Sequence, residues 1–126
     1  MTGRTFAYCR VSTTEQTTQN QILAIRNAGY DVIDSRVISE TVSGSTKTTD
    51  REQFSNLIEH KIEAGDTLVV LKLDRLGRTV KGLVELVNQL HDRKVNFKSV
   101  TDNVDTSTPS GRFFFQLLWW DKKNVL

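Results

Sequence analysis

The chain has 126 residues, of which 37% are hydrophobic and 25% are charged, a composition typical of one folded globular domain. Its longest apolar stretches fall far short of the roughly 20 residues that a membrane-spanning helix needs. It begins without the apolar core of a secretory signal, and its single cysteine excludes an internal disulfide. We therefore expect a soluble, cytoplasmic protein with no membrane partner.

A net charge of +2 is too small to indicate a nucleic-acid partner by itself, but the charge is unevenly distributed. Residues 1–63 have seven basic and eight acidic side chains, whereas residues 64–126 have ten and seven. The excess lies in one segment, where Asp74 alone opposes Lys72, Arg75, Arg78 and Lys81. A local basic cluster is expected there.

The first part of the chain predicts a strand, a helix and a second strand. An apolar strand is expected over residues 4–11, followed by a helix that Thr13 and Gln16 open as a capping box and Gly29 ends. The buried face of this helix is predicted to contain Ile22, Leu23, Ile25 and Ala28. The second strand has apolar residues at 32, 33, 37 and 38, interrupted by polar residues 34–36.

The middle of the chain predicts a loop, a helix and a third strand. Residues 39–49 are almost wholly polar and cannot pack, so a mobile loop is expected. Asp50 is a candidate cap for a helix that ends before the turn at Gly65 and Asp66, and its buried face has Phe54, Leu57, Ile58 and Ile62. The β-branched run over residues 67–73 has the pattern of a buried strand.

The last part predicts one more strand between two helices. The buried face of the first helix has Val80, Leu83, Val84, Val87 and Leu90. A strand covers residues 95–100, residues 102–109 form a polar loop, and Ser110 caps a last helix. Strands and helices thus alternate, which indicates an α/β fold with a mostly parallel sheet of four to five strands and helices on both faces.

Several kinds of site lack the residues that they need. His60 and His91 are the only histidines and are expected on helix surfaces; with Cys9 as the only cysteine, no zinc ligand set is present, and no metal or other cofactor is expected. No glycine-rich phosphate loop or dinucleotide motif occurs. A Ser-His-Asp triad is not favoured because neither histidine follows a strand.

Ser12 directly follows the first strand, and residues 74–78 follow the third. Parallel sheets bind ligands beyond the carboxyl ends of their strands, so both segments are candidate site residues. A serine nucleophile needs a group that stabilises charge on the electrophile. The available group is arginine, from Arg10, Arg75 and Arg78, and because a guanidinium matches phosphate oxygens, the expected electrophile is a phosphate.

Each of these features also has a purely structural explanation. Ser12 could belong to the helix cap, Arg10 could extend along the sheet edge to solvent, and residues 74–78 could form a salt-bridged turn. Taken singly, these explanations are the simpler ones. A serine and several arginines at one strand-end edge are not needed for folding, however, and together they favour a site.

Three motifs, in this order, resemble the catalytic domain of the serine recombinases, the resolvase/invertase family. They are Tyr8-Cys9-Arg10-Val11-Ser12-Thr13, then Glu40-Thr41-Val42-Ser43-Gly44, and Gly65-Asp66 leading into Lys72-Leu73-Asp74-Arg75-Leu76-Gly77-Arg78. The resemblance extends from about residue 4 to about residue 118.

The resemblance implies that a serine attacks a double-stranded DNA phosphodiester without a metal, leaving a 5′-phosphoserine and a free 3′-hydroxyl. It also implies homo-oligomers, a dimer and a synaptic tetramer. It assigns catalytic roles to Ser12, Arg10, Arg75, Arg78, Asp74 and Arg51, and supporting contacts with DNA phosphate to Gln16, Lys72 and Ser43. Asp74 would transfer a proton or orient the arginines.

The end of the chain departs from the family pattern. Residues 1–118 are assigned to the catalytic domain with its last helix truncated, residues 119–126 to an unrelated tail, and a DNA-binding domain is expected to be absent. The apolar run over residues 113–120 cannot all face one core, so self-association is expected.

Three functions remain open at this point. The first is a domain that cleaves and rejoins DNA when joined to a DNA-binding module. The second is a catalytically silent remnant that associates with intact subunits. The third is a flavodoxin-like binding or signalling domain, which leaves the serine and the arginines unexplained. The intact Ser12 and its arginines favour the first.

Overall fold

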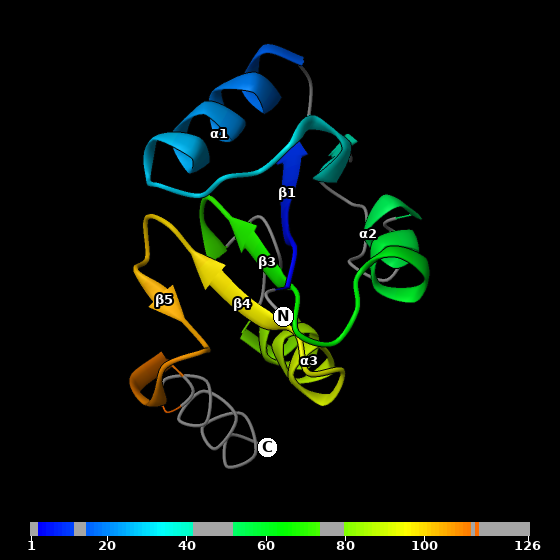
Figure 1. The fold of residues 1–126 in the computed structure, drawn as a ribbon, viewed down its shortest axis with the longest axis vertical. Coiled ribbons are helices and arrows are strands. Elements are labelled where there is room, and N and C mark those ends of the chain that lie inside the picture. Colours follow the sequence, from blue (N-terminus) through cyan, green and yellow to red (C-terminus); the bar gives the residue numbers. More distant parts are fainter. Residues whose placement is uncertain (1–2, 12–14, 42–51, 74–79, 112, 114–126) are drawn as a thin grey trace.

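Five strands form one sheet in the order β2-β1-β3-β4-β5 (Figure 1). They are β1 (Thr5–Val11), β2 (Val37–Thr41), β3 (Thr67–Val70), β4 (Asn96–Ser99) and β5 (Val104–Asp105). Strands β1 to β4 are parallel, and β5 pairs antiparallel with β4. The computed structural model describes residues 3–11, 15–41, 52–73, 80–111 and 113. The predicted mostly parallel α/β sheet is confirmed.

Helices cover both faces of the sheet, as predicted. Helix α1 (Glu15–Asn27) packs on one face, and α2 (Glu52–Asn56) and α3 (Val80–Asp92) pack on the other (Figure 1). The last turn of the α2 region, η3 (Leu57–Lys61), has π-helical hydrogen bonding, and η1 (Asp34–Arg36) is a short 3-10 turn. None of the helices in the described segments combines the length and apolar character that a bilayer crossing requires.

The alternation of side chains along β1 separates two cores. Phe6 and Tyr8 point into the larger core with residues of α2 and α3, whereas Ala7 and Cys9 point into the smaller core with Ile25 of α1. The Cys9 side chain is fully buried in the smaller core.

The predicted buried faces of α2 and α3 are confirmed. Of the residues predicted there, the structure buries all those with described side chains: Phe54, Leu57, Ile58, Ile62, Leu83, Val84, Val87 and Leu90. The predicted face of α1 is partly wrong, because Leu23 is 58% exposed and Gln21 is buried in its place. Leu23 lies about 200° around the helix from both Gln21 and Ile25, so it faces away from the sheet. Ala28 is also exposed, beyond the end of α1.

The second strand starts later than predicted and extends into the predicted loop. Strand β2 pairs with β1 from Ala7 and Val37 to Val11 and Thr41, so polar residues 39–41 form a strand rather than a loop. Ile33, predicted to be in this strand, is 48% exposed before the 3-10 turn. Backbone pairing with a central strand outweighs the polar composition here.

Two features near the end of the chain were not predicted. Strand β5 lies inside the expected polar loop over residues 102–109, and it is only two residues long. The last described helical turn starts at Pro109 and is capped by Thr108, whose Oγ1 accepts a hydrogen bond of 3.1 Å from the Gly111 N–H. The predicted cap at Ser110 is therefore wrong, because Ser110 already lies inside the turn.

Glycine supplies the turns that end two elements. Gly29 follows α1 with φ of 101°, as its predicted role as helix terminator requires, and Gly65 precedes β3 with φ of 93°. These are left-handed conformations that side-chain-bearing residues rarely adopt. Both turns return the chain to the sheet.

Candidate active site

The carboxyl ends of β2, β1 and β3 lie next to one another at one edge of the sheet (Figure 1). Strand β1 ends at Val11 and β2 ends at Thr41, while the segment that leaves β3 is described as far as Leu73. Each of these ends leads directly into a segment with predicted site residues. Those residues, which are Ser12, Ser43, Arg51, Asp74, Arg75 and Arg78, lie outside the described part of the chain.

Three predicted site residues lie in described segments. Arg10 is half-buried near the end of β1, and its Cα partner in β2 is Glu40. Lys72 is exposed in the bend that follows β3. The last β1–β3 pair is Ala7 with Val69, so Arg10 and Lys72 each lie three residues beyond it on neighbouring segments. Gln16 lies in the first turn of α1, after the end of β1.

Glu40 is a buried polar residue of β2 that the motif Glu40-Thr41-Val42-Ser43-Gly44 contains but to which the sequence assigned no role. It is only 7% exposed, and its carboxylate accepts hydrogen bonds from three groups. Oε1 accepts one from the Tyr8 hydroxyl at 2.8 Å and one from the Phe54 N–H at 3.3 Å, and Oε2 accepts one from the Gln53 N–H at 2.8 Å. One buried carboxylate therefore joins β1, β2 and the first turn of α2.

The position of Glu40 could have been inferred from strand alternation. Glu40 lies two residues after Ile38, so both side chains point to the same face of β2, where Ile38 is part of the larger core. The Tyr8 and Phe54 rings meet edge to face there, with centroids 5.1 Å apart. A buried carboxylate at this position needs donors, and Tyr8 and the α2 amides provide them.

Gln21 is a second polar residue that the sequence analysis missed. Its side chain is 2% exposed, and Nε2 donates a hydrogen bond of 3.1 Å to the Arg10 carbonyl oxygen. The β1–β3 pairing ends at Ala7, whereas β1 stays paired with β2 as far as Val11, so this amide adds a hydrogen bond to the strand beyond its pairing with β3. Gln21 Oε1 is buried and accepts no hydrogen bond within the described segments. The anchored peptide lies two residues before Ser12.

An ion pair braces the amino end of the same strands. Asp66 accepts hydrogen bonds from the Arg4 N–H, the Arg4 guanidinium and the Glu63 N–H, each at 2.8 Å. Burial alone would raise the pKa of Asp66, but the hydrogen bonds from Arg4 and Glu63 and the attraction to Arg4 outweigh it and hold the pKa below its ordinary value. The hydrogen bond to Asp66 likewise raises the pKa of Arg4. This carboxylate is therefore structural.

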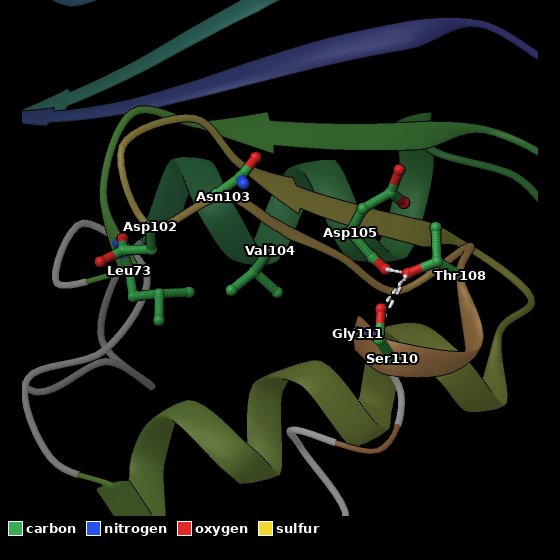
Figure 2. A pocket seen from close by; sticks show the side chains of 8 residues that line it. All are labelled: Leu73, Asp102, Asn103, Val104, Asp105, Thr108, Ser110 and Gly111. Carbon is green, nitrogen blue, oxygen red and sulfur yellow. Dashed lines mark hydrogen bonds between the residues drawn. The ribbon is translucent and has the colours of Figure 1, made fainter.

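A groove of about 630 Å³ opens beside the segment that leaves β3 (Figure 2). Leu73 forms one end of it, and residues 102–105, Thr108, Ser110 and Gly111 line the rest. The Asp105 carboxylate accepts hydrogen bonds from the Ser107 N–H and hydroxyl, which, with Lys98 nearby, lower its pKa despite burial. The Asp105 carboxylate at this groove thus already has hydrogen-bond partners within the protein.

The described residues offer no cluster of three or more metal-ligating side chains. His60 and His91 are exposed on helical segments, as predicted. What the described part of the site supplies is a cation, Arg10, beside braced strand ends. Such an edge can hold an anionic group next to a nucleophile that follows β1.

These features define an α/β domain with a polar site at the carboxyl edge of its sheet. The family described as "Resolvase, N terminal domain" matches residues 5–120. The chain is 48% identical over 111 residues to a DNA-invertase of Enterobacteria phage P7, and 44% identical over 111 residues to the serine recombinase gin of Escherichia phage Mu. Each match covers 88% of this chain, but only 56% and 54% of the relatives.

A solved structure of a recombinase catalytic domain has the same fold as this chain. The N-terminal catalytic domain of TP901-1 integrase superposes with a TM-score of 0.77 at 27% identity, covering 95% of this chain and 94% of that one. The chain therefore belongs to the resolvase N-terminal domain family, the catalytic domain of site-specific recombinases. The family assignment predicted from the sequence is confirmed. The chain spans about half the length of the curated relatives that it matches.

Proposed function

We propose that this chain supplies the cleavage and rejoining chemistry of a site-specific recombinase that acts on double-stranded DNA, with Ser12 as nucleophile. One observation carries the proposal: three neighbouring parallel strand ends lead into the segments that contain Ser12, Arg51 and residues 74–78. Membership of the resolvase family and the names of the relatives, which include DNA-invertases, support it.

The proposed reaction is a phosphodiester exchange. Ser12 Oγ loses its proton and attacks phosphorus, and the bond to the 3′ oxygen breaks as the Ser12–phosphate bond forms. The 3′ oxygen takes up a proton as it leaves. The products are a 5′-phosphoserine and a free 3′-hydroxyl. Rejoining is the reverse step with the 3′-hydroxyl of another strand, and no water or redox partner is consumed.

Arginines replace metal ions in this proposal. Arg10, Arg51, Arg75 and Arg78 would hold the non-bridging oxygens and stabilise the charge that develops on them. Loss of one such contact is expected to cost about 3 kcal/mol of transition-state stabilisation, or about a hundredfold in rate. Asp74 would transfer the proton or orient the arginines, while Gln16, Lys72 and Ser43 would support the phosphate.

The proposed partners are double-stranded DNA and further copies of the chain, in the cytoplasm. The exposed Phe113, at 59%, supports association through the segment that begins there, because an exposed phenyl ring is more stable against a partner than in water. The predicted domain boundary at residue 118 lies outside the described residues and remains part of the proposal.

The proposal is tested by trapping the covalent intermediate. The full chain is joined to a DNA-binding domain of known target and incubated with a nicked duplex that carries the target, with and without EDTA. Ser12→Ala is tested in parallel. The matched 111-residue region of the phage P7 DNA-invertase, in the same fusion, serves as positive control.

The expected result is a protein–DNA adduct at the 5′ phosphate that requires Ser12 and forms equally well in EDTA. Equal adduct formation by Ser12→Ala would contradict the assignment of the nucleophile. An adduct from the phage region but none from this chain, with both fusions bound to the target, would overturn the proposed activity and favour a silent remnant. Loss of the adduct in EDTA would overturn the metal-free chemistry.

A further inference from the structure

The turn after β4 holds the segment that leaves β3. The last residue pair of the β3–β4 ladder is Val70 with Ser99, but the hydrogen bonds continue beyond it. The Val100 N–H donates to the Val70 carbonyl at 3.0 Å, and Thr101 donates to the Leu71 carbonyl through both its N–H, at 2.9 Å, and its hydroxyl, at 2.7 Å. The backbone is therefore fixed as far as Leu71.

Asp102 extends this hold by two more residues. Its Oδ2 accepts a hydrogen bond from the Leu73 N–H at 2.8 Å and another from the Ser99 hydroxyl at 2.8 Å. Ser99 is 3% exposed and belongs to β4, so a buried hydroxyl of the rigid sheet orients the carboxylate. Figure 2 shows Asp102 and Leu73 next to each other at one end of the groove.

Folding alone does not require a carboxylate at this position. Asp102 is exposed, and water could satisfy the Leu73 N–H in its absence. The bond does, however, fix the orientation of the Lys72–Leu73 peptide group, one residue before the segment with Asp74, Arg75 and Arg78. A contact of this kind matters when the next residues must meet a reacting group, since misplacement by about 1 Å can cost about a hundredfold in rate.

We propose that Asp102 is a positioning residue for DNA cleavage: its carboxylate, oriented by Ser99, fixes the Leu73 backbone and thereby the start of the segment with Asp74, Arg75 and Arg78. The inference rests on the proposed function. Asp102 does not touch the phosphate and acts through the backbone that it holds. Thr101 performs the same task two residues earlier, at Leu71.

The test compares Asp102→Ala with Asp102→Asn in the full-chain fusion described above. The alanine variant removes the acceptor, whereas an asparagine oxygen can still accept from the Leu73 N–H. We expect Asp102→Ala to slow single-turnover adduct formation roughly tenfold to a hundredfold, with the Kd for target DNA changed less than about threefold. Asp102→Asn is expected to restore the rate to within about fivefold of wild type.

Two further measurements separate positioning from a general structural effect. Hydrogen exchange at the Leu73 amide should be faster in Asp102→Ala than in wild type, while exchange at β3 amides stays unchanged. Asp105→Ala is the matched control, because Asp105 also lines the groove but no hydrogen bond joins it to Leu73 in the described structure. It removes the same charge and should leave the adduct rate unchanged.

The outcomes distinguish the two proposals. If wild type forms the adduct and Asp102→Ala forms it at the same rate, the positioning role is wrong and the proposed function stands. An equal loss in Asp102→Ala and Asp105→Ala would also overturn it, since charge rather than the contact with Leu73 would then be responsible. If wild type forms no adduct while the phage control does, the proposed function fails and the positioning role fails with it.

Thr101→Val keeps the test valid if Asp102→Ala does not fold. This variant removes only the hydroxyl bond to the Leu71 carbonyl, and it is expected to slow adduct formation as well.

Discussion

The Tyr8 hydroxyl of β1 donates a 2.8 Å hydrogen bond to Glu40 of β2 inside the larger core. The same carboxylate accepts from the Gln53 and Phe54 N–H groups at the start of α2. Glu40 precedes residues 42–51 and the two amides follow them. One carboxylate thus fixes both ends of the segment that contains Ser43 and Arg51, two of the predicted site residues.

Removing this network should destabilise the fold by measurable and coupled amounts. Tyr8→Phe deletes one donor and is expected to lower the free energy of unfolding by about 1 kcal/mol. Glu40→Leu removes all three hydrogen bonds that the carboxylate accepts, leaves their donors without this acceptor, and should cost about 2–3 kcal/mol. Because both changes remove the same bond, the double variant should lose less than the sum. Urea unfolding of the four proteins measures this, and strictly additive losses would contradict the shared bond.

The guanidinium of Arg10 should matter for its shape as well as its charge. Arg10→Lys keeps a cation at the end of β1 but removes the paired N–H groups that match phosphate oxygens. We expect adduct formation to slow by about a hundredfold, corresponding to about 3 kcal/mol in the transition state. Single-turnover kinetics on nicked target DNA measures the rate.

The control for this change is Arg93→Lys. Arg93 follows α3, and its guanidinium donates to the Ile58 carbonyl and the Glu59 carboxylate rather than lying at the strand ends. Its replacement should leave the adduct rate unchanged. A full rate in Arg10→Lys would show that charge alone suffices at this position.

Acid should weaken the fold in part through Asp66. An unfolded aspartate has a pKa near 3.9, and the bonds from Arg4 and Glu63 hold the pKa of Asp66 below its ordinary value in the fold. Between these two pKa values the unfolded chain binds more protons than the folded chain. The stabilisation that Asp66 gives the fold is therefore fully present above about pH 4 and is lost as the pH falls through the pKa of the folded state.

Asp66→Asn is the variant that isolates this effect. It should lower the free energy of unfolding at pH 7 by about 2 kcal/mol and flatten its dependence on pH below about 5. Urea unfolding between pH 2.5 and 7, the range that brackets the ordinary aspartate pKa of about 3.9, provides the comparison. A pH dependence as steep as that of wild type would contradict the assignment to Asp66.

The sequence predicted the parts of the fold that depend on apolar periodicity. The buried faces of α2 and α3 are each set by residues three or four positions apart, and these faces were correct. Errors arose where a polar residue was buried or an apolar one exposed, as with Gln21 and Leu23 in α1. The sequence shows the period of a helix, but its exact rotation depends on the sheet against which it packs.

The site was predictable to a different extent. The parallel topology predicted from the sequence is confirmed, and it brings the strand ends that precede the predicted site residues to one edge of the sheet. The supporting residues were missed, since their partners are distant in sequence: Glu40 bonds Tyr8 across 32 positions, and Asp102 bonds Leu73 across 29. Strand β5 was missed because two residues carry no alternation.

Gln21 allows stability and activity to be separated. Gln21→Met keeps the length and burial of the side chain but removes the bond to the Arg10 carbonyl and also the buried, unpaired Oε1. Loss of the hydrogen bond should destabilise the fold by about 1 kcal/mol, and removal of the buried Oε1, which has no partner in the described part of the chain, should stabilise it by about the same amount. The free energy of unfolding should therefore change by less than about 1 kcal/mol. The adduct rate should nevertheless fall about tenfold, because the peptide two residues before Ser12 loses its hydrogen bond from Gln21.

Gln19→Met, on the exposed side of α1, is the matched control and should change neither the free energy of unfolding nor the adduct rate. A full adduct rate in Gln21→Met, with Gln19→Met also unchanged, would show that β1 holds its end without this amide.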